Sequence, residues 1–229
     1  MAENSIVPTH IGIIPDGNRR WAKAKGLPSL KGHEQGFKAF QPVAEAAFDA
    51  GVEVFSAWGF STENWKRTAE EVSYLMDLFV HYLGNEAKSL HEKNIKLLIS
   101  GSRAELSGKL LAAIDSAERL TAGNSRGVIN ICLNYGGRQE LVDAVNELMR
   151  EGKSSVTAED LSQHLYHELP DVDLIIRTAG ERRLSGFMPW QGVYSELYFS
   201  DKYWPDFTPE DLRLALEDFA TRKRTFGGS

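Results

Sequence analysis

The sequence has only one cysteine and no long uninterrupted apolar run. These two features exclude several classes of protein. Cys132 is the only thiol among 229 residues, so neither an internal disulfide framework nor a thiolate metal cluster is available. It lies in the apolar run 128–133, where a buried small hydrophobe is expected. No window approaches the roughly 18–20 apolar residues of a membrane-spanning helix, and residues 1–5 lack the features of a signal peptide. We therefore expect a cytoplasmic chain with no transmembrane segment.

An excess of basic residues is also missing. The formal net charge is −6, whereas a nucleic-acid surface shows a basic stripe, so no nucleic-acid partner is expected. Apolar residues make up 42% and charged residues 25%, values that are ordinary for a globular protein with a real core.

Several signature motifs are absent as well. The sequence contains no G-x-x-x-x-G-K-[ST] and no G-x-G-x-x-G, which excludes the common nucleotide-binding loops. It also lacks the second histidine of a zinc-protease helix and the Asp-Asp-x-x-Asp metal motif of trans-type prenyl synthases. Any active site must therefore be sought elsewhere.

What the sequence does have is a regular alternation of strand-like and helical segments. The apolar patterns predict strands at 10–14, 52–60, 95–99, 128–133 and 174–176, and helices at 33–50, 69–90, 103–121, 138–150, 157–168 and 208–224. Such alternation predicts an α/β fold with a mostly parallel central sheet flanked by helices. No linker or repeat interrupts it, so we expect a single domain over residues 1–229.

Ligands of open α/β sheets bind at the carboxyl ends of strands, and the first predicted strand is followed by the polar segment 15–22. Gly17 permits a tight turn, the helix that follows offers free N–H groups, and Arg20 is suited to phosphate oxygens. Asp16 would hold a hard cation such as Mg²⁺. An ordinary turn with solvated arginines is the alternative, because Asp-Gly-Asn is common in turns.

Two further polar segments follow predicted strands. Residues 60–67 combine a hydroxyl, an amide, an indole and two cations, although part of this segment could cap the next helix. Residues 176–185 carry Arg177, Arg182 and Arg183, which could form an anion cradle or a solvated face. Three phosphate-suited segments indicate one substrate with several phosphate groups, or two phosphorylated substrates.

In their order along the chain, these segments resemble the cis-prenyltransferase family, whose best-known members make undecaprenyl diphosphate. The resemblance extends from His10 to Gly228. The matching motifs are D-G-N-R-R-W-A at 16–22, G-H at 32–33, F-S-T-E-N-W-x-R at 60–67, L-N-Y-G-G-R at 133–138, I-R-T-x-G-E at 176–181, R-x-S at 183–185, W-Q-x-x-Y-x-E-L-Y-F at 190–199 and W-P-D-F at 204–207.

The resemblance implies an Mg²⁺-dependent prenyltransferase, a homodimer in which one α/β domain holds a hydrophobic substrate tunnel. Its substrates would be isoprenoid diphosphates, namely dimethylallyl diphosphate with isopentenyl or geranyl diphosphate. It implies that Asp16 organises Mg²⁺ on a substrate diphosphate and that Glu196 lies near the metal and the subunit contact. Ser61, Asn64 and His33 would join Asp16 as catalytic residues, although His33 could instead be a structural histidine at a helix start.

The substrate-binding positions fall into three groups. Groups around the allylic diphosphate are implied at Gly17, Asn18, Arg20, His33 and Arg67, and Arg19, Trp21 and Ser29 are further substrate-binding candidates. Ser61, Asn64 and Trp65 would belong to a loop that orders over the active site, unless Trp65 simply packs. Arg177, Arg183 and Ser185 would form the second diphosphate site.

The sequence departs from the pattern of long-chain members of the family. The departures are Ser29 in place of an arginine, Lys31 in place of an aromatic residue, Ala179 in place of glycine, Arg182 in place of histidine, Pro15 in place of methionine, and Thr225-Phe226-Gly227 in place of a C-terminal arginine-x-glycine. Bulky Tyr74, His81 and Tyr82 in the predicted helix 69–90 would shorten the tunnel, unless they face solvent or a partner.

These departures favour a short product. They favour irregular, lavandulyl- or cyclolavandulyl-type coupling of dimethylallyl diphosphate with a second short allylic diphosphate. The alternative is regular head-to-tail cis-elongation with isopentenyl diphosphate, as in undecaprenyl diphosphate synthase. A non-catalytic subunit of a heteromeric prenyltransferase is a third possibility, against which the retained Asp16, Asn18, Arg20 and Asn64 argue.

Overall fold

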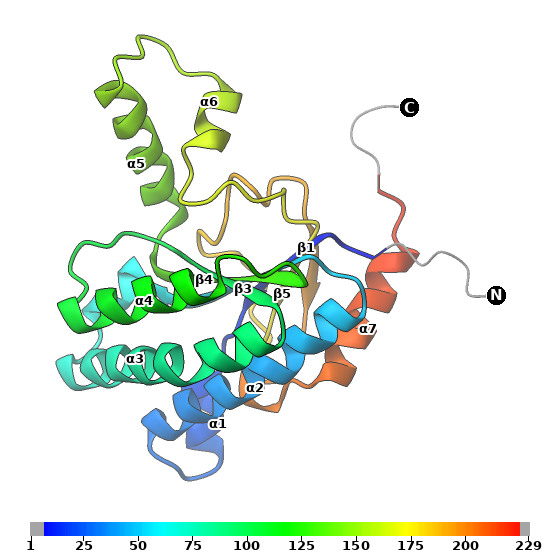
Figure 1. Ribbon diagram of the computed structural model, residues 1–229. Helices are drawn as coiled ribbons and strands as arrows, with labels where there is room; N and C mark the ends of the chain where they lie inside the picture. Colours follow the sequence, from blue (N-terminus) through cyan, green and yellow to red (C-terminus); the bar gives the residue numbers. More distant parts are fainter. Residues whose placement is uncertain (1–6, 225–229) are drawn as a thin grey trace. The chain divides into compact units, whose positions relative to one another are not determined.

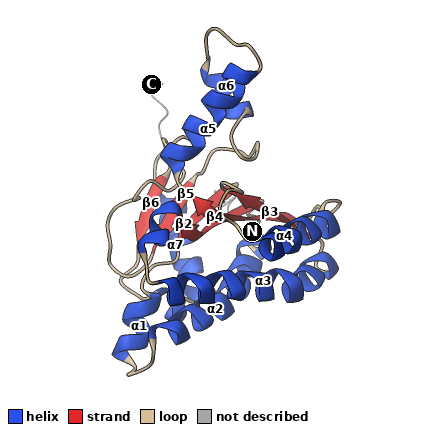
Figure 2. Cartoon of the chain, turned by 90° about the vertical axis from the view of Figure 1, so that its left-hand side faces the viewer, coloured by secondary structure: helices blue, strands red, loops and turns tan. Residues whose placement is uncertain are grey.

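The computed structural model describes residues 7–224, in which helices and strands alternate around a six-stranded sheet (Figures 1 and 2). The strand order is β3-β4-β2-β1-β5-β6. The strands are β1 (His10–Ile14), β2 (Val54–Ser61), β3 (Ile95–Ser100), β4 (Gly127–Tyr135), β5 (Leu174–Arg177) and β6 (Glu196–Phe199). The pairs β1–β5, β3–β4 and β5–β6 are parallel. The predicted α/β class with a parallel sheet is thereby confirmed.

The helices follow the predicted order. They are α1 (Asn18–Ala24), α2 (Ser29–Asp49), α3 (Ala69–Glu92), α4 (Gly108–Thr121), α5 (Gly137–Arg150), α6 (Ala158–Gln163) and α7 (Pro209–Thr221), with short 3₁₀ helices η1 (Thr62–Lys66) and η2 (Trp204–Asp206). Within residues 7–224, no helix is long and apolar enough to cross a membrane.

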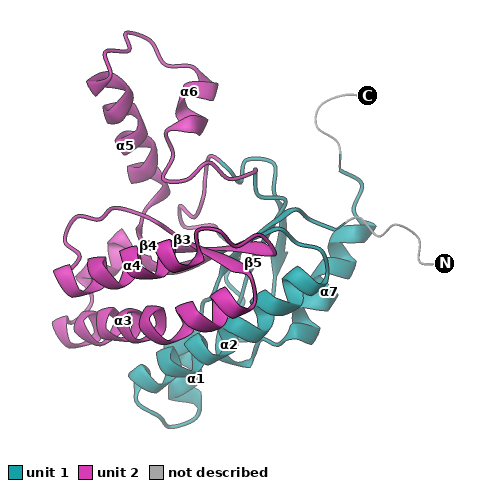
Figure 3. Ribbon diagram, viewed as in Figure 1, with its two compact units in different colours: residues 1–56, 171–183, 191–229 teal, residues 57–170, 184–190 magenta. Residues whose placement is uncertain are grey.

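The chain divides into two compact units (Figure 3). The first comprises residues 1–56, 171–183 and 191–229, and the second comprises residues 57–170 and 184–190. Strand β2 begins in the first unit and ends in the second. The extent of a single domain over residues 1–229 stays a prediction.

The core of the first unit is formed by β1 and β5, whose residues are all buried. Helix α2 packs against α1, α7 and η2. Gly32 and Gly36 allow this close packing, because a Cβ atom on Gly32 would lie 1.9 Å from the carbonyl oxygen of Asn18 in α1. Trp204 of η2 donates from Nε1 to the carbonyl oxygen of Gly36 at 2.8 Å.

The second unit packs α3 against β3 and α4. Thr68 caps α3 by accepting from the N–H of Glu71 at 3.3 Å, and the predicted apolar stripe buries Leu75, Phe79, Leu83 and Leu90. Cys132 is fully buried in β4, and burial, together with the charge of Glu140, raises the pKa of its thiol well above the ordinary value. The expected burial of Cys132 is confirmed.

Some predicted boundaries were wrong for identifiable reasons. The helix predicted from residue 103 begins at Gly108, because Ser107 caps it by accepting from the N–H of Leu110. The helix predicted at 157–168 ends at Gln163. The predicted departure at Thr225-Phe226-Gly227 lies outside the described residues.

Candidate functional site

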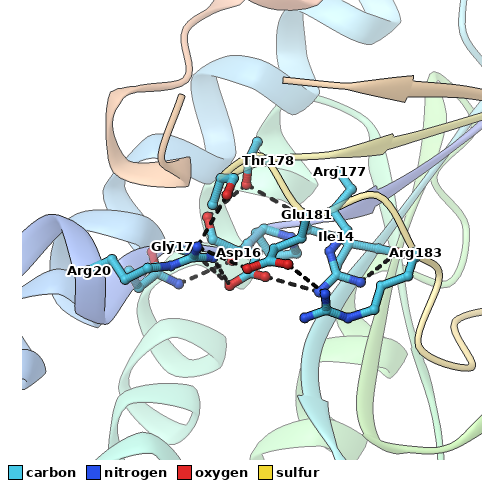
Figure 4. Close-up of polar contacts among 11 residues, drawn as sticks. Ile14, Asp16, Gly17, Arg20, Arg177, Thr178, Glu181 and Arg183 are labelled. Atoms are coloured by element: carbon cyan, nitrogen blue, oxygen red, sulfur yellow. Dashed lines mark hydrogen bonds and ion pairs between the residues drawn. The ribbon is translucent and has the colours of Figure 1, made fainter. Parts of the chain in front are cut away.

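The first unit brings Asp16 and Arg177 together at the carboxyl ends of two adjacent strands. Ile14, the last residue of β1, pairs with Arg177, the last residue of β5. Arg177 donates from Nη2 to Asp16 Oδ2 at 3.0 Å (Figure 4). The Arg177 side chain is 6% exposed and that of Asp16 is 31% exposed, so a buried cation is neutralised by a carboxylate that solvent can reach.

Gly17 forms the turn between β1 and α1. Its φ of 101° lies in the left-handed region, and a Cβ atom there would lie 2.6 Å from the ring of Tyr203 and 2.8 Å from Ala179 Cβ. The N–H of Gly17 donates to Asp16 Oδ1 at 2.7 Å. The turn starts α1, from which Arg20 extends back to form an ion pair of 3.3 Å with Asp16. Glycine is therefore required both by conformation and by space.

The electrostatic environment keeps Asp16 ionised. Burial by itself would raise the pKa of Asp16, but the hydrogen bond and charge of Arg177, the N–H of Gly17 and the charge of Arg20 outweigh it and lower the pKa below the ordinary value of 3.8. Because the folded-state pKa is depressed, this contribution to stability is present at neutral pH and is lost as the pH falls through the folded pKa.

Glu181 completes the cluster, and sequence reasoning gave it no role. Its Oε1 accepts from Arg20 Nη1 at 3.0 Å and its Oε2 accepts from Arg183 Nη1 at 2.5 Å (Figure 4). Arg177 donates from Nη1 to the backbone oxygen of Arg183. Three guanidinium groups thus share two carboxylates, which leaves one net positive charge to attract anions.

Other predicted residues of the first unit occupy supporting positions. Trp21 is buried and donates from Nε1 to Asp206 Oδ1 at 2.7 Å, which links α1 to η2. Asn18 donates to the carbonyl oxygen of Pro15 at 3.2 Å. His33 is buried in α2, as the structural alternative expects, whereas Arg19 and Ser29 are exposed.

One chain does not bring the two predicted metal ligands together. Glu196 pairs with Leu174, at the start of β5, and forms an ion pair of 2.8 Å with Arg222. Asp16, in contrast, lies beside Arg177 at the other end of β5. Among residues 7–224, no group of three or more histidine, cysteine or acidic side chains is arranged to hold a metal ion.

The second unit holds Ser61, Asn64 and Trp65 in one ordered turn after β2. Ser61 caps η1 by accepting from the N–H of Glu63 at 3.1 Å, and its own N–H donates to Asn64 Oδ1 at 3.1 Å. Trp65 donates from Nε1 to Asn134 Oδ1 at 2.8 Å and packs edge-on against Phe60. The capping alternative is therefore correct as local structure, although the capped helix is η1 and not α3.

Asn134, a second residue without a predicted role, supports this turn. It has a left-handed φ of 51°, and its Nδ2 donates to the carbonyl oxygens of Ser102 and Ala104 at 3.0 and 2.9 Å. Its place in the L-N-Y-G-G-R motif was the available signal. Two further predicted residues also lie in the second unit. Arg67 forms an ion pair of 2.9 Å with Glu71, and Ser185 has a left-handed φ of 54°.

The three bulky residues predicted to narrow a tunnel are not equivalent. Tyr82 is buried in α3 and Tyr74 is half-buried. His81 is exposed and makes a hydrogen bond with Asn85, one turn along the helix. The solvent-facing alternative is thus favoured for His81, and Tyr82 is left as the stronger obstruction candidate.

A cleft of about 410 Å³ opens in the second unit and contains none of the predicted site residues. It is lined by Ile99, Gly101, Ser102, Arg103, Asp143, Tyr166 and His167. Burial lowers the pKa of His167, whose Nε2 contacts the carbonyl oxygen of Ile99 at 3.2 Å. Arg103, which also lines the cleft, forms an ion pair of 3.1 Å with Glu118.

Comparison with known proteins identifies the family. Residues 14–227 match the family model described as "Putative undecaprenyl diphosphate synthase". The chain belongs to the cis-prenyltransferase family. It is therefore an enzyme that transfers prenyl groups, as the motifs predicted.

Two curated relatives of this cis-prenyltransferase are similar over nearly their whole length. A ditrans,polycis-undecaprenyl-diphosphate synthase of Pseudomonas putida, specific for (2E,6E)-farnesyl diphosphate, is 48% identical over 99% of this chain and 93% of its own. An isoprenyl transferase of Fusobacterium nucleatum is 45% identical over 97% of this chain and 96% of its own.

Two solved structures have the same fold as this cis-prenyltransferase. Lavandulyl diphosphate synthase from Lavandula x intermedia, in complex with dimethylallyl diphosphate, superposes with a TM-score of 0.93 at 32% identity and covers 97% of this chain and 99% of its own. A "probable undecaprenyl diphosphate synthase" from Campylobacter jejuni superposes with a TM-score of 0.84 at 29% identity, over all of both chains.

Proposed function

We propose that this chain elongates an allylic prenyl diphosphate with isopentenyl diphosphate by regular head-to-tail cis-condensation. The observation that carries the proposal is the cluster of Asp16, Arg20, Arg177 and Arg183 at the carboxyl ends of β1 and β5. It occurs in a chain 48% identical to a farnesyl-diphosphate-specific undecaprenyl diphosphate synthase. The departures in the sequence favoured irregular coupling, and this proposal replaces that interpretation with regular elongation.

The chemistry suits these side chains. Condensation breaks the bond between the allylic carbon and its diphosphate, the double bond of isopentenyl diphosphate attacks that carbon, and loss of a proton completes the step. Guanidinium groups bind phosphate oxygens with paired hydrogen bonds and stabilise charge that develops on a leaving group. Arg20 would serve the allylic diphosphate, and Arg177 and Arg183 the second substrate.

We further propose Mg²⁺ as the metal, held by Asp16. A site with one accessible carboxylate fits Mg²⁺, which is commonly bound through one or two carboxylates, substrate phosphates and water. Asp16 Oδ2 accepts a hydrogen bond from Arg177, and a carboxylate oxygen has a further lone pair for a cation. When bound, the ion neutralises charge on the departing diphosphate. Glu196 faces Arg222 within one chain, so we leave it out of this donor set.

The turn after β2 provides a second group of proposed functional residues. Ser61 and Asn64 are held by reciprocal capping bonds and Trp65 by Asn134, so their side chains are preorganised rather than free to swing. We propose that this turn and Arg67 contact substrate, in keeping with the motif that they form. Such preorganisation is typical of side chains that position a reacting group.

Irregular coupling is the second candidate, and two observations favour it. The lavandulyl diphosphate synthase superposes with a TM-score of 0.93, and Ser29 at the start of α2 is exposed where a long-chain enzyme would carry an arginine. Two parallel reactions distinguish the candidates, one with dimethylallyl diphosphate alone and one with farnesyl and isopentenyl diphosphates, both analysed by mass spectrometry. We expect a linear polyprenyl series in the second only. A branched ten-carbon product in the first would instead support irregular coupling.

Tyr82 provides a test of product length. Its ring is buried on the stripe that carries Phe79 and Leu83, so a Tyr82→Ala variant should open space for a growing chain. We expect the product distribution to lengthen by one or more five-carbon units, read by mass spectrometry. His81→Ala, on the exposed face, is the matched control and should leave the distribution unchanged. Equal distributions for Tyr82→Ala and the native chain would place Tyr82 outside the tunnel wall.

We propose that the enzyme is a homodimer that associates near β6. This strand stands at the edge of the sheet order, and the exposed fractions of Val193, Tyr194 and Leu197 are 67%, 64% and 36%. An exposed edge strand with apolar side chains favours association. Sedimentation of the purified chain measures this directly, with a monomer as the contrary result.

A further inference from the structure

Glu181 occupies the guanidinium groups that the proposed function assigns to phosphates. One of its oxygens lies 3.0 Å from Arg20 and the other 2.5 Å from Arg183, so a single carboxylate bridges a residue of α1 and a residue of the loop after β5. Figure 4 shows Glu181 among these arginines. A carboxylate and a diphosphate use the same guanidinium donors, so the two anions compete for Arg20 and Arg183.

The exposure of the cluster makes this competition possible. The side chains of Arg20 and Arg183 are 43% and 60% exposed, and that of Glu181 is 28% exposed. An incoming anion can therefore reach both arginines from solvent. Arg177, in contrast, is 6% exposed and is bound to Asp16. It therefore stays in place when an anion replaces Glu181 at Arg20 and Arg183.

The backbone around Glu181 is fixed, so release requires only a change of its side chain. Ala179 and Gly180 have left-handed φ values of 72° and 74°. Their N–H groups donate to the carbonyl oxygens of Lys202 at 2.7 Å and Ser200 at 2.9 Å. These bonds hold the turn, whereas a partly exposed glutamate changes rotamer within picoseconds to nanoseconds.

We propose that Glu181 is a displaceable counter-ion, which neutralises Arg20 and Arg183 in the free enzyme and yields them to the diphosphates of the two substrates. The inference rests on the proposed function, because it assumes that these arginines bind diphosphate. Glu181 thereby keeps the cluster from holding stray anions and weakens the hold on released pyrophosphate. The hydrogen bond and charge of Arg183, with the charge of Arg20, lower the pKa of Glu181, so it remains an anionic competitor at neutral pH.

The test compares the binding of inorganic pyrophosphate to the native chain and to a Glu181→Gln variant by calorimetry, in buffer without divalent metal. Glutamine keeps the size of the side chain and removes its charge. We expect the dissociation constant to fall by roughly three- to tenfold, the range expected when two partly exposed ion pairs no longer compete. The same variant should lower KM for isopentenyl diphosphate more than it changes kcat.

Glu210→Gln is the matched control. Glu210 pairs with Arg213 on α7 and is well exposed, so the variant removes one equal charge and should bind pyrophosphate as the native chain does. An unchanged or weaker affinity in Glu181→Gln would overturn the counter-ion role and leave the proposed function standing. If neither the native chain nor the variant bound pyrophosphate, the assignment of these arginines to diphosphate binding would be contradicted, and with it both proposals.

Discussion

An Asp16→Asn variant is expected to lose turnover by about 10³-fold or more while it keeps its fold, because the carboxylate is the accessible acid beside the buried cation Arg177. The amide keeps the shape but carries no charge for a metal ion. Arg177 then lacks its ionic partner, so we expect a loss of about 1–3 kcal/mol in the free energy of unfolding. Steady-state kinetics and chemical denaturation measure the two effects separately.

Asp173→Asn is the matched control for this variant. Asp173 forms an ion pair of 2.9 Å with Arg224 and accepts from the N–H of Thr9, beside the opposite end of β5. Removal of its charge should cost comparable stability and leave turnover within about twofold of native. If Asp16→Asn kept full activity, or if both variants lost activity alike, Asp16 would not be the metal-binding residue.

A Gly32→Ala variant is expected to lose both stability and activity, although it adds only one methyl group. The new Cβ atom would lie 1.9 Å from the carbonyl oxygen of Asn18 and 3.2 Å from Ala22 Cβ, so α1 must shift away from α2. Overpacking of this kind costs about 2–3 kcal/mol. Because α1 carries Arg20 into the cluster, a displacement near 1 Å should reduce kcat/KM by about 100-fold.

Gly84→Ala is the opposite case and controls for helix propensity. Gly84 lies in the middle of α3 and is exposed, and the position that a Cβ atom would take there has nothing within 4 Å of it. This variant should gain about 0.5–1 kcal/mol in the free energy of unfolding and keep native activity. Denaturation curves for both variants provide the measurement, and a Gly32→Ala variant as stable as the native chain would contradict the close contact of α1 with α2.

The parts of the fold that sequence predicted well are those with a strong periodic signal. Strand β1 was predicted at its observed bounds, because all five of its residues are buried and three of them are isoleucine. Helix α3 carries a full apolar stripe over 24 residues. Strand β6 was missed because it has only four residues, of which Leu197 is exposed and the other three are only partly buried. Helix α1 was seen only as a helical start, since it has seven residues and buries two.

The candidate site was predictable as a set of residues but not as a set of contacts. Motifs singled out Asp16 and Arg177, yet their pairing depends on β1 lying beside β5. These two strands are more than 150 residues apart in the sequence. Glu181 was quoted within a motif, but no pattern of charges tells which carboxylate faces which arginine. Glu196 was predicted to lie near the same metal as Asp16. The register of β6 with β5 instead places Glu196 at the end of β5 away from Asp16.

The most direct test of the central claim is the stoichiometry of pyrophosphate release against incorporation of labelled isopentenyl diphosphate, with farnesyl diphosphate as primer and Mg²⁺ present. We expect one pyrophosphate for each isopentenyl unit incorporated, and loss of both signals when either substrate or the metal is withheld. Pyrophosphate release without incorporation, or no release from the complete mixture, would contradict regular cis-elongation by this chain.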